Sequence, residues 1–434
     1  MSPSVTVLPG GLRVCVESVP QYGRGLAAVA LTVAAGGDDD PAGRHGTAHL
    51  VEHLMFPRSG REGSADPAGE GYAALVAGAG GVCNAETHRD HTVFHTTVPA
   101  ELLPDALAWE AGRLLGFAPT EDVLRTETDV IGEEIRGAGD AGRYWESALG
   151  ALYPGSRDSF GTAAELAGIT AGEVEAFFRA HYTAPRMVLS VVGDVDPARV
   201  VAVVREVFAG VVPTAEETRA AEAPRTARET RAAEAPRAAT EIRTAPLPAG
   251  RPGVAVGHPL PDPVADRPAY LAQAVLAQVL GRSRLPALAR SARNGHRLTS
   301  ATVTCGYHGQ WLASAAPDLT LAVLGRAPGT EVGAAVDIWR SVLRAVADGP
   351  LPEAEHRRAV NSLLVAWHRQ ADSLSTRAVA LGRDALLLPG SAGPDALPAA
   401  LRRTTPAEVA AAARALLEGP VTVTELAPQK GTVG

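Results

Sequence analysis

The residues with the clearest chemistry are His49, Glu52 and His53, which lie in the segment Gly-Thr-Ala-His-Leu-Val-Glu-His-Leu-Met-Phe at positions 46–56. The segment is predicted to be a short helix, because small residues open it, apolar residues fill it and a proline follows it. Positions four apart share a helix face, so both histidines can direct a ring nitrogen at one metal ion. Two histidines and a neighbouring carboxylate are typical of a zinc hydrolase. The alternative is two partly buried helix histidines beside a solvated glutamate.

A third protein ligand is expected from the amphipathic helix at residues 121–136. Glu127 and Glu134 are two helical turns apart, and the apolar residues between them, including Ile131, mark their face as the inward one. A carboxylate on an inward apolar face is costly unless it is paired or bound to a cation. Glu134 and Glu127 are therefore candidates for the missing ligand and a supporting carboxylate. Glu133 points about 100° away and is expected in solvent. The alternative is an ordinary surface helix.

Composition narrows the class of protein. The chain has 434 residues, 46% hydrophobic and 20% charged, which fits two or three globular domains. A net charge of −8 argues against a nucleic-acid or anionic-membrane surface and is compatible with a cationic peptide substrate. The three cysteines are far apart and form no C-x-x-C pair, which favours a reducing compartment. The first residues do not resemble a signal peptide, so a cytoplasmic location is expected.

The remaining pattern alternates strands and helices on both sides of a low-complexity segment. In the first half we expect a hairpin at 4–17, strands at 26–35, 80–95 and 187–192, and helices at 66–78, 101–115, 121–136, 171–182 and 198–208. In the second half we expect strands at 253–257, 301–305, 310–315, 319–324 and 421–425, and helices at 268–280, 285–293, 331–347, 353–370, 376–387 and 406–417. This order predicts two similar α+β halves, each a mixed or antiparallel sheet with helices packed on it.

The segment at 213–248 separates the halves. A nine-residue sequence that begins at Glu217 recurs at Glu229, and the surrounding residues are rich in Ala, Glu, Arg and Pro. Such a composition lacks the large apolar residues that a core needs, so it predicts a linker. The expected domains are thus 1–212 and 249–434.

Two polar clusters have competing interpretations. Asp38, Asp39 and Asp40 could bind a cation, although a solvated loop is the favoured interpretation. His88, His91 and His95 could ligate a metal, but we favour the view that they line a sheet edge or the mouth of a cleft.

The order His-x-x-Glu-His, the reverse of the common zinc-protease motif, is the inverzincin pattern. With four further segments, this motif resembles the M16 peptidases. The segments are Leu-Pro-Gly-Gly-Leu-Arg-Val at 8–14, Asn-Ala-Glu-Thr-His-Arg-Asp-His-Thr-Val-Phe at 84–94, Glu-Thr-Asp-Val-Ile-Gly-Glu-Glu-Ile at 127–135 and Val-Val-Gly-Asp-Val-Asp at 191–196. The M16 peptidases include pitrilysin and mitochondrial processing peptidase, and the length resembles the small bacterial M16B type. The resemblance implies a zinc metalloendopeptidase whose two halves close in a clam-like manner around a peptide or an unfolded leader segment.

The resemblance also implies roles for individual residues. His49, His53 and Glu134 would ligate one Zn²⁺ per chain, and Glu52 would be the general base. Glu127 would support the ligands from the same helix as Glu134. Asn84 and Ala85 would lie on an edge strand that pairs with the substrate backbone.

The second half departs from the family pattern. Active members carry an arginine and, seven residues on, a tyrosine that hold the substrate carbonyl; here Arg293 is followed at that spacing by Ser300. We therefore expect a heterodimer, in which a second M16-like subunit supplies the Arg/Tyr pair, and an inactive second half. Two alternatives remain: a non-catalytic M16-like scaffold subunit, and a metal-dependent hydrolase of non-peptide substrates.

Overall fold

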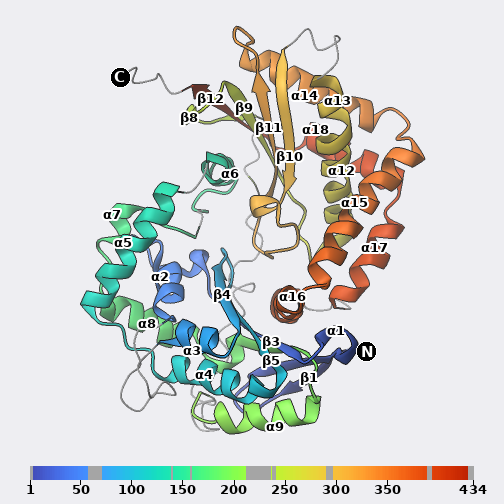
Figure 1. Ribbon diagram of the computed structural model, residues 1–434. Coiled ribbons are helices and arrows are strands. Elements are labelled where there is room, and N and C mark those ends of the chain that lie inside the picture. Colours follow the sequence, from blue (N-terminus) through green and yellow to red (C-terminus); the bar gives the residue numbers. More distant parts are fainter. Residues whose placement is uncertain are drawn as a thin grey trace. The chain divides into compact units, whose positions relative to one another are not determined.

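The computed structural model describes residues 3–56, 71–137, 140–156, 159–211, 236, 241–289, 297–388 and 393–428. The chain forms two compact α+β units (Figure 1). Unit 1 comprises Met1–Gly137, Asp158–Ala232 and His368–Pro394, and unit 2 comprises Ala138–Arg157, Ala233–Trp367 and Asp395–Gly434. The expected α+β class with two domains of similar construction is confirmed.

Unit 1 is built on a six-stranded mixed sheet in the order β1-β2-β6-β3-β5-β4. Its strands are β1 (Ser4–Val7), β2 (Arg13–Ser18), β3 (Leu26–Val33), β4 (Val82–Thr87), β5 (Thr92–Pro99) and β6 (Met187–Gly193). Among the described strands of this sheet, β2 and β6 pair in parallel and the other neighbours are antiparallel. The expected hairpin is present, with Val5 opposite Cys15. All seven residues of β6 are buried, because apolar clusters cover the sheet on both faces.

Most of the helices of unit 1 come from the first half of the chain. They are α1 (Pro20–Gly23), α2 (Thr47–Leu54), α3 (Tyr72–Gly78), α4 (Leu103–Leu115), α5 (Glu121–Gly137), α7 (Ala163–Leu166), α8 (Ala171–His181) and α9 (Pro197–Val207), with short 3-10 turns at Gly37–Asp39, Ala100–Leu102 and Ala184–Arg186. The sequence alone identifies the start of α8: Thr170 accepts from the backbone of Glu173, whose side chain bonds back to Thr170. Of the helix expected at 66–78, residues 66–70 lie outside the described residues.

Unit 2 has a second six-stranded sheet, in which β10-β11-β9-β12-β7 are consecutive and β8 also pairs with β12. Its strands are β7 (Ile242–Arg243), β8 (Leu247–Ala249), β9 (Gly253–Pro259), β10 (Leu298–Cys305), β11 (Leu319–Arg326) and β12 (Thr422–Pro428). Strands β7 and β8 fall at the end of the expected linker, so this part of 213–248 belongs to the sheet. The repeats at 217–225 and 229–237 lie almost wholly outside the described residues.

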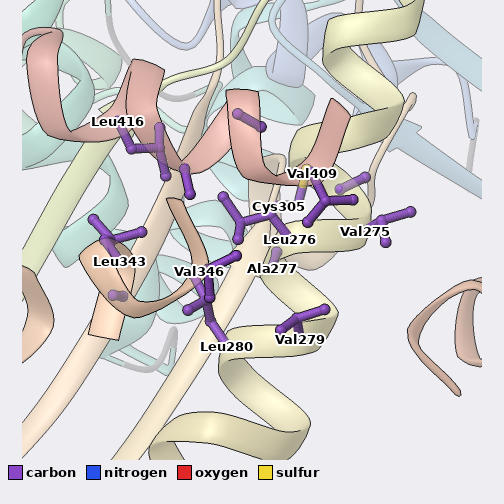
Figure 2. Packing of buried hydrophobic residues seen from close by; sticks show 14 of the residues in the cluster. Val275, Leu276, Ala277, Val279, Leu280, Cys305, Leu343, Val346, Val409 and Leu416 are labelled. Carbon is purple, nitrogen blue, oxygen red and sulfur yellow. The ribbon is translucent and has the colours of Figure 1, made fainter. Parts of the chain in front are cut away.

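The helices of unit 2 other than α6 pack into one apolar cluster. The helices of the unit are α6 (Asp140–Leu152), α12 (Arg267–Val279), α13 (Leu285–Ala289), α14 (Val332–Ala347), α15 (Glu353–Ala371), α17 (Leu397–Arg403) and α18 (Pro406–Glu418), with a π-helical turn at Leu280–Arg284 and 3-10 turns at Tyr307–Gly309 and Pro394–Ala396. Figure 2 shows Leu276 of α12 packed with Val346 of α14 and Val409 of α18. Nine of the thirteen residues of α12 are buried, which explains its largely apolar sequence.

A third strand is absent from the meander expected in this half. Residues 310–315 form a loop between β10 and β11 rather than a strand. Leu312 has φ of 59° and its backbone N–H donates to Tyr270 Oη. The apolar residues of 310–315 are buried or half-buried within that loop. A short apolar run does not by itself distinguish a strand from a buried loop.

Each unit is completed by a helix from the other half of the sequence. Helix α16 (Leu374–Leu387) packs across β3, β5 and β6 of unit 1 (Figure 1). Helix α6, which the sequence pattern does not predict, packs on β9 and β12 of unit 2. The compact units therefore differ from the expected boundaries at 1–212 and 249–434. An amphipathic pattern marks a face that must be buried, but it does not say which sheet buries it.

Candidate metal centre

Helix α2 is positioned by the aspartates that precede it. The Asp40 carboxylate accepts from the backbone N–H groups of Gly46 and Ala48, at 2.7 and 2.8 Å, and so caps the helix. Asp38 pairs with Arg89 through two hydrogen bonds, and Asp39 accepts from Gly36 N. The expectation of a solvated loop is therefore wrong: the three aspartates are engaged in ion pairs and caps that fix the start of the helix.

Gly46 also has a conformation that the helix start requires. Its φ is 97°, and a Cβ at this position would lie 2.8 Å from the Phe160 carbonyl oxygen. A glycine is therefore required here for both the backbone angle and the close approach.

The two histidines of α2 meet Glu134 of α5. Glu134 Oε2 lies 3.7 Å from His49 Nε2 and 3.6 Å from His53 Nε2. Among the residues that the structure describes, His49, His53 and Glu134 are the one group of three or more His, Cys, Asp or Glu side chains able to hold a metal ion, with ligand atoms within 4.8 Å of one another. Ligand atoms around a tetrahedral zinc ion are about 3.3 Å apart, so the spacing and the donor types fit zinc.

His53 is oriented by a second carboxylate. Its Nδ1 lies 3.2 Å from Glu127 Oε2, and Glu127 is buried on the inward face of α5 together with Leu124 and Ile131. A carboxylate on the far nitrogen of a ligand histidine fixes the ring and raises its basicity. Glu133 is 77% exposed and pairs with Arg136, as the helix geometry predicts.

Glu52 points into the same site. Its Oε2 lies 4.0 Å from His49 Nε2 and accepts a hydrogen bond from Thr87 Oγ1 at 2.5 Å. Burial raises the pKa of Glu52, and the hydrogen bond from Thr87 opposes that shift. A carboxylate with a raised pKa is suited to general-base chemistry near neutral pH.

Thr87 is a functional candidate that no motif in the sequence marks. It lies on β4, three residues after Asn84, so its side chain is on the opposite face of the strand. Thr87 shares with Ala85 the face of β4 that is directed toward α2. A hydroxyl side chain at this position was the feature of the sequence that could have indicated the hydrogen bond to Glu52. The ring of Phe160 also contacts His49 edge-on, with ring centroids 5.2 Å apart.

The predicted substrate residues lie on an edge strand. Asn84 and Ala85 belong to β4, which is the last strand of the sheet of unit 1 and pairs only with β5 within it. Asn84 is exposed and Ala85 is buried. Arg293 lies outside the described residues. Ser300 is exposed on β10, the edge strand of the other sheet.

The three histidines of the β4–β5 region do not join the metal group. His88 and His91 stack in the turn between the strands, with ring centroids 4.4 Å apart, and His91 Nδ1 is 2.8 Å from Asp90 Oδ1. His95 Nδ1 lies 2.8 Å from Ser375 Oγ of α16.

Two α+β units, one of which carries His-x-x-Glu-His on a helix facing a glutamate, are the architecture of an M16-type protein. The chain belongs to the M16 peptidase family. Residues 16–136 match the family model described as insulinase (peptidase family M16), and residues 168–363 match the model described as the peptidase M16 inactive domain.

Named relatives match this chain over about half of its length. An uncharacterized zinc protease of Mycobacterium tuberculosis is 32% identical over 213 residues, which cover 48% of this chain and 47% of the relative. A probable β subunit of the mitochondrial-processing peptidase of Arabidopsis thaliana is 30% identical, over 47% of this chain and 38% of the relative. The chain thus spans about half the length of the curated relatives it matches.

The fold extends beyond the region of sequence similarity. The crystal structure of a protease from Helicobacter pylori superimposes with a TM-score of 0.79 and 19% identity, covering 98% of this chain and 99% of the other. Among the described residues, no helix is both long and apolar enough to cross a membrane.

Proposed function

We propose that this chain is a zinc metalloendopeptidase subunit that cleaves peptides or unfolded leader segments. The observation that carries the proposal is the convergence of His49 Nε2, His53 Nε2 and Glu134 Oε2 beside the largely buried Glu52 carboxylate. Membership of a peptidase family and the names of the zinc-protease relatives support it. Three protein ligands leave a coordination position for a water or substrate oxygen, as catalytic zinc sites require.

The residues of the chain divide the chemistry between them. Bound zinc would supply a Lewis acid that makes water acidic enough to react near neutral pH. Glu52 would take the proton from the attacking water and pass it to the leaving amine. Thr87 holds the Glu52 carboxylate in place, and Glu127 holds His53. Each chain would bind one zinc ion.

The outer edge of β4 is the proposed position of the substrate. An edge strand presents unpaired backbone groups, to which an extended peptide can add as a further strand. Ala85 and Asn84 lie on this strand, and its last residue, Thr87, contacts Glu52. The substrate backbone would therefore run beside the general base. A role for Arg293 stays a prediction from the family resemblance.

The proposed active form is a heterodimer. Ser300 stands where the family pattern expects a tyrosine, and residues 168–363 match an inactive-domain model. A second M16-like subunit would supply the Arg/Tyr pair. The purified chain alone should then cleave slowly, and high activity of the isolated chain would rule out this part of the proposal. A cytoplasmic location is likewise a prediction, supported by three free cysteines.

A non-catalytic role within an M16 complex is the main alternative. The inactive-domain match favours it, whereas the complete set of His49, His53, Glu134 and Glu52 favours catalysis. Zinc content separates the two: the peptidase should bind one zinc ion per chain, and Glu134→Gln should lose it. A chain without zinc after purification in zinc-containing buffer would support the scaffold.

Turnover is tested with a panel of internally quenched peptides, with and without a chelator. Glu52→Gln is the matched variant, because it keeps the ligands and removes the base, and it should lower turnover by about 10²- to 10⁴-fold while zinc content is unchanged. Cleavage that survives in Glu52→Gln would contradict the assignment. Hydrolysis of small esters or amides without peptide cleavage would favour a hydrolase of non-peptide substrates.

A further inference from the structure

One face of β4 is exposed beside the candidate site. Ala85 packs into the apolar cluster that contains α2, and Thr87 on the same face contacts Glu52. Alternate residues point to the opposite face, where Asn84 and Glu86 are exposed and Val82 is 69% exposed. Helix α16 covers this second face at β3, β5 and β6. The outermost strand thus presents polar side chains to solvent next to an edge that pairs with no other strand among the described residues.

The backbone pattern shows which groups face that edge. His88 N donates to His91 O at 2.8 Å, so these two residues form a hydrogen-bonded pair at the turn. Because bonded and non-bonded pairs alternate in an antiparallel ladder, Thr87, Ala85 and Cys83 direct their backbone groups away from β5. A peptide that pairs with this edge would place alternate side chains on the face that carries Glu86.

Glu86 is a fixed carboxylate on that face. Its Oε2 lies 3.2 Å from His88 Nε2, while 46% of its side chain stays exposed. The hydrogen bond from His88 lowers the pKa of Glu86, against the opposing effect of partial burial. Other charges of the turn are engaged elsewhere: Arg89 binds Asp38, and Asp90 lies 2.8 Å from His91. The buried His91 also lies in the field of Arg383 of α16.

We propose that Glu86 forms a subsite for a lysine or arginine side chain of a peptide paired with the outer edge of β4. The inference rests on the proposed function and names its substrate class, a peptide with a basic side chain on the face of β4 that carries Glu86. Opposite charges on neighbouring strands attract across the pair, and like charges repel. The net charge of −8 also favours a cationic peptide over an anionic one.

Binding is measured with the full chain carrying Glu52→Gln, so that peptides are not consumed. Fluorescence anisotropy compares peptides of one length that carry a single lysine, glutamine or glutamate, moved one position at a time. At one position, the lysine peptide should bind about two- to five-fold more tightly than the glutamine peptide, and the glutamate peptide more weakly. Adding Glu86→Gln should remove this preference, and adding Glu86→Lys should reverse it.

Glu133→Gln is the control, because Glu133 is an exposed carboxylate of unit 1 on α5 rather than β4. It should leave the preference unchanged. If the lysine preference persists in Glu86→Lys, the subsite is overturned. If the chain that retains Glu52 still shows zinc-dependent cleavage, the proposed function stands. Absence of both peptide binding and cleavage would overturn the subsite together with the proposed function.

Discussion

Nδ1 of His53 lies 3.2 Å from Oε2 of Glu127, which is only 5% exposed. This contact links the ligand helix α2 to α5 independently of the metal. Glu127→Gln keeps the shape but removes the charge, so it should weaken zinc binding by about 10- to 100-fold. Competition with a chelator of known affinity measures the change. Glu133→Gln, on the solvent side of the same helix, should bind zinc like the unaltered chain, and equal affinities for both variants would exclude the supporting role.

Thr87→Val should change the pH dependence of turnover. The hydroxyl hydrogen bond lowers the pKa of Glu52 against the effect of burial, so its loss raises that pKa further. The general base then stays protonated up to a higher pH, and the acidic limb of the kcat/KM profile should move to higher pH. Thr87→Ser retains the hydroxyl and should restore the original profile. A valine variant with lower activity but an unmoved limb would contradict this role.

The packing of α16 gives a stability prediction. Gly382 lies so close to the sheet of unit 1 that a Cβ would stand 2.5 Å from Thr32 Oγ1 and 2.8 Å from Ser190 Oγ. Gly382→Ala should therefore destabilise the unit by about 1–3 kcal/mol, because the buried helix must shift away from the strands. Thermal unfolding of the chain measures the effect.

Gly172 provides the matched control for that substitution. It lies in α8 of the same unit, and a Cβ added there would meet no atom within 4 Å. Gly172→Ala should leave stability unchanged or raise it by less than about 1 kcal/mol, through helix propensity. If both variants unfold at the same temperature, α16 does not pack as tightly as the structure shows.

A pH-dependent stability is expected from His258 in unit 2. It is 2% exposed, accepts a hydrogen bond from Trp339 Nε1 at 3.0 Å, and burial lowers its pKa from 6.5 to about 3. The folded state then binds fewer protons than the unfolded state between these values. The contribution of His258 to the free energy of unfolding is fully present above pH 6.5. Below pH 6.5 it falls by about 1.4 kcal/mol for each pH unit.

His258→Gln tests this dependence, since it can keep an acceptor for Trp339 without titrating. The variant should lose less stability than the unaltered chain between pH 6 and pH 4, by about 1.4 kcal/mol for each pH unit. Hydrogen exchange of the β9 amides follows unit 2 specifically. Parallel pH profiles in the two proteins would show that His258 does not carry the effect.

The candidate site was largely predictable because its spacing is local. His49 and His53 are one helical turn apart and Glu127 and Glu134 two turns apart, so each pair needs only helix geometry to share a face. The inward carboxylates of α5 made Glu134 a candidate for the third ligand, and the family resemblance implied the same residue. The Asp40 cap was missed, because a carboxylate that bonds eight residues ahead has no fixed sequence signature.

The helices that complete each sheet were not predictable in the same way. The strands of unit 1 and most of its helices follow from alternation and helical periodicity. The sequence pattern did not predict helix α6. It predicted a helix at the position of α16, but not that this helix belongs to unit 1. A helix pattern encodes a buried face, whereas the sheet that receives the face depends on packing over the whole chain.

The placement of α16 has a consequence for biosynthesis. The apolar face formed by residues such as Ala28, Ala30 and Val188 is covered by Ala378 and Leu381 of α16. During translation, the strands of that face leave the ribosome well before the helix that covers it. Unit 1 cannot reach its final packing until residue 387 has emerged, so the metal-binding half of the sequence must wait for a helix that is synthesised long after it.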